Sequence, residues 1–533
     1  MTDPAPRRRP SLRFVAAAVT LALVFAGGVA RVAPGTGPSR AASAGTARIL
    51  VDAPSGIDPA HQSDLASAVV DSQLFESLTA IDSSLAVRPA LAASWEIQDG
   101  GRRVVFQLRP GLTFSDGTPL GARDVVRSWM RVLDPAEPSP LASLLDGVTD
   151  ATAYSTGKDP DPAHVGITAS GNDVVVSLDR PASDFPAIAA SPTLAVVPAS
   201  TAAMKAGPGF VGSGGYVLSA ETSTQLTLVG NSRYWAGPPA IGTLQLLTDI
   251  GGRSPVQAFQ DGQLDYTPIA DSDASWIAYD RTLGPQLRSV ASLSVDYYGF
   301  DTSRPPFSDP RVREAFAMAV DWGRLVALSA APGTRQATSM VPPGIPGRSA
   351  TDFAPVYDPA AARTLLAQAG YQGGKGFPTV TLATPGYPYD AGIVRQIRAN
   401  LGIDLGYETM ASADYFARLA GDPPAMWALS WVADYPGPDD FLGLLLGTGA
   451  ANNYGRWSSA AFDAAIQAAG AATDPAAIQA AFDRAQTVVQ HQVPVIPVSY
   501  GSGWALSRTG LLGAGENGLG IMRMAGLAWQ GGS

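Results

Sequence analysis

One hydrophobic core organises roughly 250 to 300 residues at most, and this chain has 533. The chain must therefore divide into at least two lobes. Hydrophobic residues make up 46% of it and charged residues 15%, which is typical of a compact globular protein and excludes a disordered one. Strand-like and helix-like segments alternate without a repeat of about 20 to 50 residues. The sequence predicts a mixed α/β fold and excludes solenoids and propellers.

Several segments carry clear local signals. Apolar residues recur at helical spacing in 65–78, and short apolar runs at 47–51, 104–108 and 174–178 predict strands. An acid followed by proline marks two helix starts, because the carboxylate can cap the first turn and proline favours it. These two starts are Asp309-Pro310 and Asp474-Pro475.

The N-terminus predicts export from the cytoplasm. Four arginines within the first 13 residues precede an apolar stretch at 14–30, as in an export signal of the general or the twin-arginine type. Ala42-Ser43-Ala44 offers a cleavage site, but the apolar stretch is nearly long enough to stay in the bilayer, so cleavage and anchoring both remain open. We interpret residues 1–45 as export signal or anchor followed by a flexible spacer. Without cysteine the chain cannot be a lipoprotein attached through that residue, and it has no disulfide.

Charge and motifs narrow the function. A net charge of −10 argues against nucleic acid as a partner. No G-x-S-x-G, Walker or H-E-x-x-H pattern occurs, and the three histidines are isolated in the sequence. The sequence therefore predicts no cofactor and no metal site, and these absences favour a protein that is not an enzyme without excluding a hydrolase.

The most informative motif sets Asp434 between the aromatic residues Trp431 and Tyr435 in an otherwise apolar run. Burying an ionised carboxylate is costly unless a cation or several donors meet it. One interpretation is that Asp434 caps the turn at 436–438. The other is that it meets a cation of a ligand. Spacing alone leaves both open.

This W-x-A-D-Y-P motif resembles a signature of the peptide-binding family of solute-binding proteins, the extracytoplasmic receptors of ABC importers for oligopeptides, dipeptides and nickel. Five further blocks resemble the same family and follow its order along the chain. They include L-F-E-S-L at 74–78, followed by R-P-A-L-A-A-S-W-E, and R-P-G-L-T-F-S-D-G-T-P-L at 109–120. The others lie at 212–216, 297–313 and 495–500, so the resemblance covers nearly all of 50–500.

The resemblance implies a two-lobed, periplasmic-binding-protein-like clamp of type II with an extra inserted domain. The chain would cross between lobes near Tyr297 and again near Ser499, and hinge closure would enclose the ligand. The predicted division is lobe I at 46–79, 199–296 and 499–533, the inserted domain II at 80–198, and lobe III at 297–498.

The resemblance also implies a function: capturing short peptides and delivering them to an ABC permease with its ATPase subunits. Asp434 would hold the α-ammonium group of the peptide. Such a receptor would be a monomer in the periplasm or on the outer face of the cytoplasmic membrane. The remaining candidate ligand-binding residues are Trp431, Ala433, Tyr435, Tyr297, Tyr500, Leu141 and Arg418.

Two of these candidates mark departures from the family pattern. Leu141 stands where relatives can carry tyrosine, and Arg418 would have to replace the arginines that relatives carry shortly before the tryptophan. Ligand identity therefore stays open to a nickel chelate, an oligosaccharide or a peptide-like natural product. The sequence is also compatible with a secreted hydrolase that uses Asp434 with Asp439 or Asp440, and with a membrane-tethered sensor.

Overall fold

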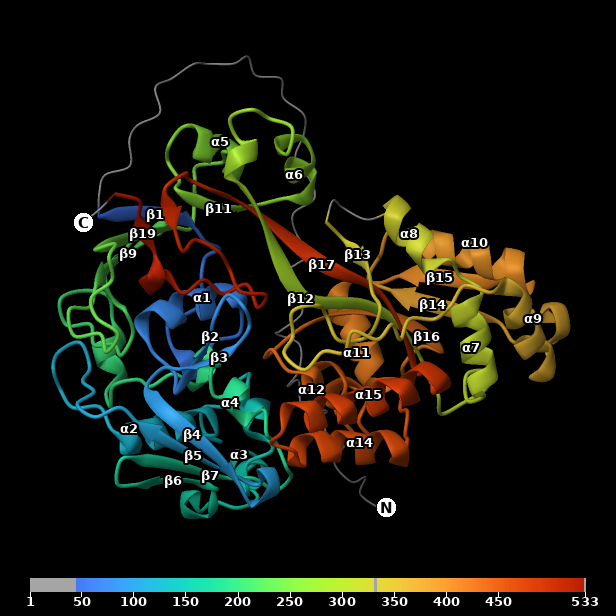
Figure 1. Ribbon diagram of the computed structural model, residues 1–533, viewed down its shortest axis with the longest axis horizontal. Coiled ribbons are helices and arrows are strands. Elements are labelled where there is room, and N and C mark those ends of the chain that lie inside the picture. Colours follow the sequence, from blue (N-terminus) through green and yellow to red (C-terminus); the bar gives the residue numbers. More distant parts are fainter. Residues whose placement is uncertain (1–44, 330–332, 532–533) are drawn as a thin grey trace, which may run out of the picture.

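The structure is a computed structural model that describes residues 45–329 and 333–531. Two lobes lie side by side, and two long strands, β12 (Leu287–Phe300) and β17 (Val495–Ser507), run between them (Figure 1). The predicted export signal and spacer fall outside the described residues, apart from residue 45. Among helices in the two described ranges, none has the length and apolarity that a membrane span requires.

Lobe I is built around strand β1, whose alternating sequence T-A-R-I-L turns Ala47 and Ile49 into the core. β1 pairs in parallel with β10 and β11, and the strands of this lobe follow the order β11-β1-β10-β9-β8. The elements of lobe I are β1 (Thr46–Leu50), α1 (Leu65–Leu74), β8 (Tyr216–Glu221), β9 (Gln225–Gly230), β10 (Thr243–Leu247), α5 (Pro255–Gln260), β11 (Tyr266–Ile269), α6 (Asp271–Ile277), β18 (Leu511–Leu512) and β19 (Ala528–Trp529).

A separate antiparallel sheet of order β4-β5-β7-β6 lies within 80–198, the residues predicted to form the inserted domain. Phe185 packs against Phe106 and Trp129 in its core, and the indole N–H of Trp129 donates to the Leu194 carbonyl at 2.8 Å. The elements are β4 (Ala92–Gln98), β5 (Arg103–Leu108), α2 (Ala122–Val132), α3 (Ala151–Ser155), β6 (Ile167–Ser170), β7 (Asp173–Ser177) and α4 (Phe185–Ile188), and a hairpin of β2 (Thr79–Ile81) and β3 (Val87–Pro89) connects them to lobe I.

Lobe III places two parallel strands beside β16 in the order β15-β14-β16-β12, with helices packed around them (Figure 1). Its elements are α7 (Pro310–Met318), α8 (Trp322–Ser329), β13 (Arg335–Gln336), α9 (Pro359–Gln368), β14 (Val380–Thr384), α10 (Asp390–Leu401), β15 (Leu405–Thr409), α11 (Ser412–Gly421), β16 (Met426–Val432), α12 (Pro438–Phe441), α13 (Gly443–Leu446), α14 (Ala460–Ala471) and α15 (Pro475–Gln492).

β12 and β17 pair with each other in antiparallel fashion and carry the chain between the lobes. β17 reaches lobe I through β11, and the second half of β12 pairs with β16 of lobe III. The register of the β12–β17 pair is interrupted between Ala291 and Val295, midway along the connection. Tyr297 and Ser499, where the crossings were expected, lie in these two strands. The residue boundaries of the lobes stay a prediction.

Both predicted helix starts are confirmed. Asp309 accepts a hydrogen bond from the backbone N–H of Arg311 at the start of α7, and Asp474 accepts one from Ala477 at the start of α15, each at 2.9 Å. The helix predicted over 65–78 is too long, because α1 ends at Leu74 and the chain continues in extended form from Phe75.

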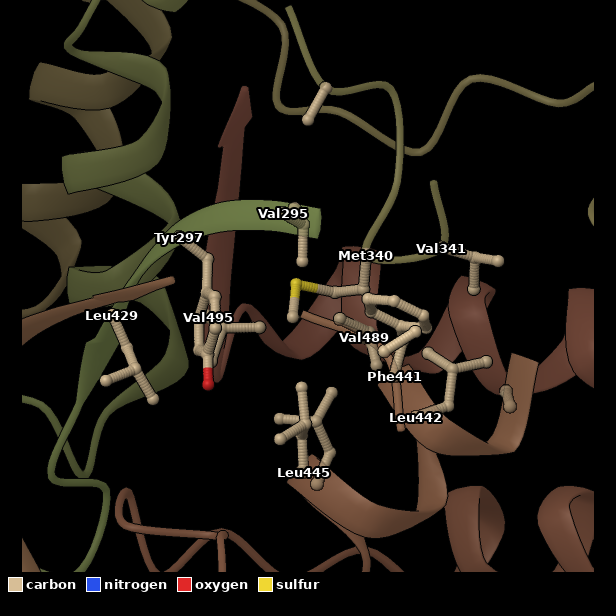
Figure 2. Close-up of a cluster of buried hydrophobic side chains, with 14 of the residues drawn as sticks. Val295, Tyr297, Met340, Val341, Leu429, Phe441, Leu442, Leu445, Val489 and Val495 are labelled. Atoms are coloured by element: carbon tan, nitrogen blue, oxygen red, sulfur yellow. The ribbon is translucent and has the colours of Figure 1, made fainter. Parts of the chain in front are cut away.

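The side chain of Tyr297 in β12 points into the core of lobe III. Figure 2 shows Tyr297 beside Leu429 and Val495, while Val295 lies near Met340. Tyr297 is 1% exposed, and burial raises the pKa of its hydroxyl well above the usual range. Packing, and not an open surface, therefore surrounds this side chain.

One buried group in lobe I opposes folding at neutral pH. Asp71 of α1 is completely buried, and neither carboxyl oxygen has a hydrogen-bond partner among the described residues. Burial, with a contribution from Asp58 and Asp64, raises its pKa well above the usual range. A raised folded-state pKa means that unfolding releases a proton, so this group costs stability increasingly as the pH rises above the unfolded value.

We expect Asp71→Asn to raise the free energy of unfolding at pH 7 by about 1 to 3 kcal/mol, since it removes the cost of ionising a buried acid. The gain should disappear near pH 4, where the unfolded carboxyl also keeps its proton. Thermal or urea unfolding at both pH values measures it, with exposed Asp52→Asn as the control. A loss of stability at pH 7 would contradict the unpaired state of Asp71.

Candidate functional site

A cavity of about 480 Å³ lies between the lobes. Its wall combines the end of α1 and the C-terminal segment from lobe I, the loop before α4 from the inserted domain, and the end of β16 with α12 and α13 from lobe III. Because all three parts form its wall, the shape of the cavity would change if the lobes moved. This volume is typical of sites for small molecules.

The segment after β16 brings the predicted motif to the cavity. The backbone N–H of Ala433 donates to the carbonyl of Leu293 at 2.9 Å, which extends the pairing with β12 past the end of the strand. The fully buried Asp440 of α12 then accepts hydrogen bonds from the indole N–H of Trp431 at 2.9 Å and from the backbone N–H of Asp434 at 3.3 Å. Asp440 thus fixes both Trp431 and the backbone of Asp434.

The carboxyl group of Asp434 has no hydrogen-bond or ion-pair partner in the described part of the chain. Backbone bonds from Gly437 to Tyr435 and from Asp440 to Gly437, at 2.9 and 3.2 Å, hold the turn that follows. The structure therefore does not support Asp434 as the cap of this turn. Burial raises the pKa of the half-buried Asp434 to about 6, because no cation nearby offsets its loss of solvation.

Four further predicted site residues share the cavity wall with Asp434. These are Leu141, Trp431, Ala433 and Tyr435. Leu141 comes from the inserted domain, and the other three come from lobe III. Their contact with a ligand stays a prediction.

Three predicted site residues lie away from the cavity wall. Tyr297 packs edge-on against Trp427 in the core, with ring centroids 5.7 Å apart. The Tyr500 hydroxyl donates to the carbonyl of Ser339 and accepts from its backbone N–H, both at 2.9 Å, so it ties the chain after β13 to β17. Arg418 forms an ion pair with Glu408 on the surface. For Tyr297 and Tyr500, proximity to the hinge in sequence does not determine which face of the strand the side chain occupies. Arg418 lies in helix α11, on the surface.

The wall of lobe I contains an ion pair between Glu76 and Arg523 that the sequence did not predict. Glu76 is 3% exposed, and its carboxylate accepts from Arg523 at 2.9 Å, while the Tyr234 hydroxyl also bonds to it. The charge of Glu76 raises the pKa of the Arg523 guanidinium above its usual range. Glu76 belongs to the L-F-E-S-L block, but 447 positions separate it from Arg523, so no local signal could pair them.

The wall of the inserted domain approaches the motif through Asp184. Burial raises the pKa of its carboxyl, which lies beside the Tyr435 hydroxyl. A Cβ placed on Gly437 would lie 3.6 Å from Asp184 Oδ2. Burial and the charge of Asp184 raise the pKa of nearby Asp439 to about 7. The described residues contain no group of three or more histidine, cysteine or acidic side chains that could hold a metal ion.

The family model of bacterial extracellular solute-binding proteins, family 5 Middle, matches residues 86–453. The chain belongs to this family. Among curated relatives, the probable deoxycholate-binding periplasmic protein YgiS of Escherichia coli K12 is 31% identical over 470 residues, covering 84% of this chain and 86% of YgiS. The periplasmic murein peptide-binding protein MppA of the same organism is 28% identical and covers 85% and 86%.

The fold agrees with this membership. The unliganded open form of MppA superimposes with a TM-score of 0.80 at 25% identity, covering 92% of this chain and 98% of that one. A second MppA structure, at 24% identity, gives 0.70. The predicted two-lobed α/β clamp is confirmed, and the protein is a solute-binding protein of family 5.

Proposed function

We propose that this protein captures short peptides outside the cytoplasm and delivers them to the permease and ATPase subunits of an ABC importer. The observation that carries the proposal is the unpaired carboxyl group of Asp434 in the wall of a cavity shared by the lobes. A peptide ammonium would supply the missing cation. The likeness to MppA, a murein peptide-binding protein, supports the same ligand class.

The physical logic suits peptides of varied sequence. Backbone groups are common to all peptides, so anchoring the ammonium and pairing the ligand backbone give affinity without selecting side chains. The paired strands β12 and β17 would act as the hinge, since both lobes connect through them. We propose an exported monomer, held at the membrane if its N-terminal segment is not cleaved.

The likeness to YgiS raises a second candidate, the anion deoxycholate. The cavity wall opposes it, because its described residues include six acids and two arginines. An anionic ligand would be repelled by this excess of negative charge. Cationic or zwitterionic ligands fit better.

We propose binding without turnover, because the chain belongs to a family of solute-binding proteins and one of the two hydrolytic carboxylate pairs does not fit the site. In the pair of Asp434 with Asp440, Asp440 is buried and accepts hydrogen bonds from the Trp431 indole and the Asp434 backbone N–H. Asp440 therefore stabilises the segment after β16, and it is not among the residues of the cavity wall. Incubating the protein with peptides and searching for cleavage products tests this point, and we expect none.

Binding should raise thermal stability, because the ligand binds only the folded protein. At a hundredfold excess over Kd we expect a gain of about 2.7 kcal/mol, measured as a shift of the unfolding transition with a tripeptide library. Deoxycholate should give no comparable shift. A library that leaves the transition unchanged at millimolar concentration, with deoxycholate raising it, would contradict the peptide assignment.

A further inference from the structure

The cavity wall carries more negative charge than one peptide ammonium can neutralise. Glu76 is the one acid of the wall with an ion-pair partner in the described chain. Arg523 is engaged with it, which leaves Arg180 as the other cation of the wall. The six acids are Asp64, Glu76, Asp146, Asp184, Asp434 and Asp439.

Two of these acids meet where the inserted domain approaches lobe III. Asp184 precedes α4 and Asp439 lies in α12. Asp184 Oδ2 and Asp439 Oδ1 are both buried, and neither has a hydrogen-bond partner among the described residues. A buried oxygen without a donor is costly, so each position would gain from a donor brought by a ligand.

The Tyr435 hydroxyl bonds to the Asp184 carboxyl group and the Gly443 backbone N–H lies beside that of Asp439, and each lowers the pKa of its carboxyl group. Neither donor bonds to the two unpaired oxygens. Burial raises the pKa of both carboxyl groups, and the charge of the Arg180 guanidinium lowers each only in part. No ion pair of Arg180 with either carboxyl group occurs in the described chain. Oδ1 of Asp439 occupies the space that a Cβ on residue 443 would fill, so Gly443 permits its position.

The pair lies close to the place proposed for the peptide ammonium. Asp184 is beside the hydroxyl of Tyr435, which directly follows Asp434. A ligand whose ammonium meets Asp434 would bring the side chain of its first or second residue toward Asp184 and Asp439. Lysine and arginine side chains carry a cation with several donors at their ends.

We propose that Asp184 and Asp439 form a second cation subsite, and that the protein prefers short peptides with a basic side chain at the first or second residue. This inference rests on the proposed peptide-binding function. Since the two acids come from different parts of the clamp, a cation held between them would also join the inserted domain to lobe III.

Calorimetry on the full exported chain with matched tripeptides tests the preference. We expect Lys-Ala-Ala or Ala-Lys-Ala to bind about tenfold tighter than Ala-Ala-Ala or more, and Glu-Ala-Ala to bind more weakly than Ala-Ala-Ala. Asp184→Asn and Asp439→Asn should each reduce the ratio between the basic and the neutral peptide. Asp404→Asn, which removes an exposed acid paired with Arg398, should keep the ratio of wild type.

The outcomes separate the two proposals. Equal binding of basic and neutral peptides by the wild-type protein overturns the second subsite and leaves the peptide receptor standing, and this result does not depend on any variant folding. A basic preference that survives both substitutions also overturns the assigned residues. Failure of every peptide to bind overturns the proposed function and this inference with it.

Discussion

Asp434→Asn is expected to weaken peptide binding by about 2 to 5 kcal/mol, because it removes the charge facing a desolvated ammonium and keeps the shape of the side chain. Stability of the unliganded protein should not fall, since no described residue bonds to this carboxyl group. Burial raises its pKa to about 6. The cost of this raised pKa to folding therefore builds up as the pH rises from the usual value of 3.8 to about 6 and is present in full above that, where the variant should be more stable.

Calorimetry with Ala-Ala-Ala at pH 7.5 measures the affinity, and urea unfolding measures the stability. The matched control is Asp422→Asn, which removes an exposed carboxylate 3.1 Å from Arg304. Exposed pairs contribute little, so the control should bind like wild type. A variant of Asp434 that loses stability and retains affinity would restore its interpretation as a turn cap.

Arg313→Met is expected to lower the free energy of unfolding by about 3 kcal/mol or more. Arg313 of α7 is 3% exposed, and its guanidinium donates to the carbonyls of Phe307, Gln492 and Val493. It thereby fixes the end of α15 immediately before β17. Methionine fills the space of the stem but leaves these carbonyls without their donors.

Arg311→Met, two positions earlier, is the control. Its guanidinium is exposed and pairs with Asp309 at 2.6 Å, so its loss should cost less than about 1 kcal/mol. Arg313→Lys should resemble the methionine variant, because one ammonium cannot reproduce the planar fork of donors. Equal unfolding free energies for the Arg311 and Arg313 methionine variants would contradict this account.

Much of the fold could be predicted from the sequence, because the signals are local or belong to ordered blocks. The caps at Asp309 and Asp474 depend on neighbouring residues, and the structure confirms both helix starts. The end of α1 was misplaced, since the apolar pattern continues through Leu78 while the chain turns extended at Phe75. Hydrogen bonds from the distant residues Tyr234 and Arg523 to Glu76 favour the extended conformation. Such long-range bonds cannot be predicted from the spacing of apolar residues.

The candidate site was predictable only in part. Asp434 and its neighbours followed from the motif, and they line the cavity. Tyr297 and Tyr500 were placed by their nearness to the hinge in sequence, which does not reveal the face on which each side chain packs. The contact of Asp184 with Tyr435 joins residues that are 251 positions apart, so it depends on how the inserted domain docks.

The central claim is that the Asp434 carboxylate binds the α-ammonium group of a peptide. Calorimetry on four combinations tests it most directly: wild type and Asp434→Asn, each with a free and an N-acetylated tripeptide of the same sequence. The account predicts that acetylation weakens binding to wild type by about as much as the substitution does and adds much less in the variant, because both changes delete one pair. Losses that add in full would contradict the proposed contact.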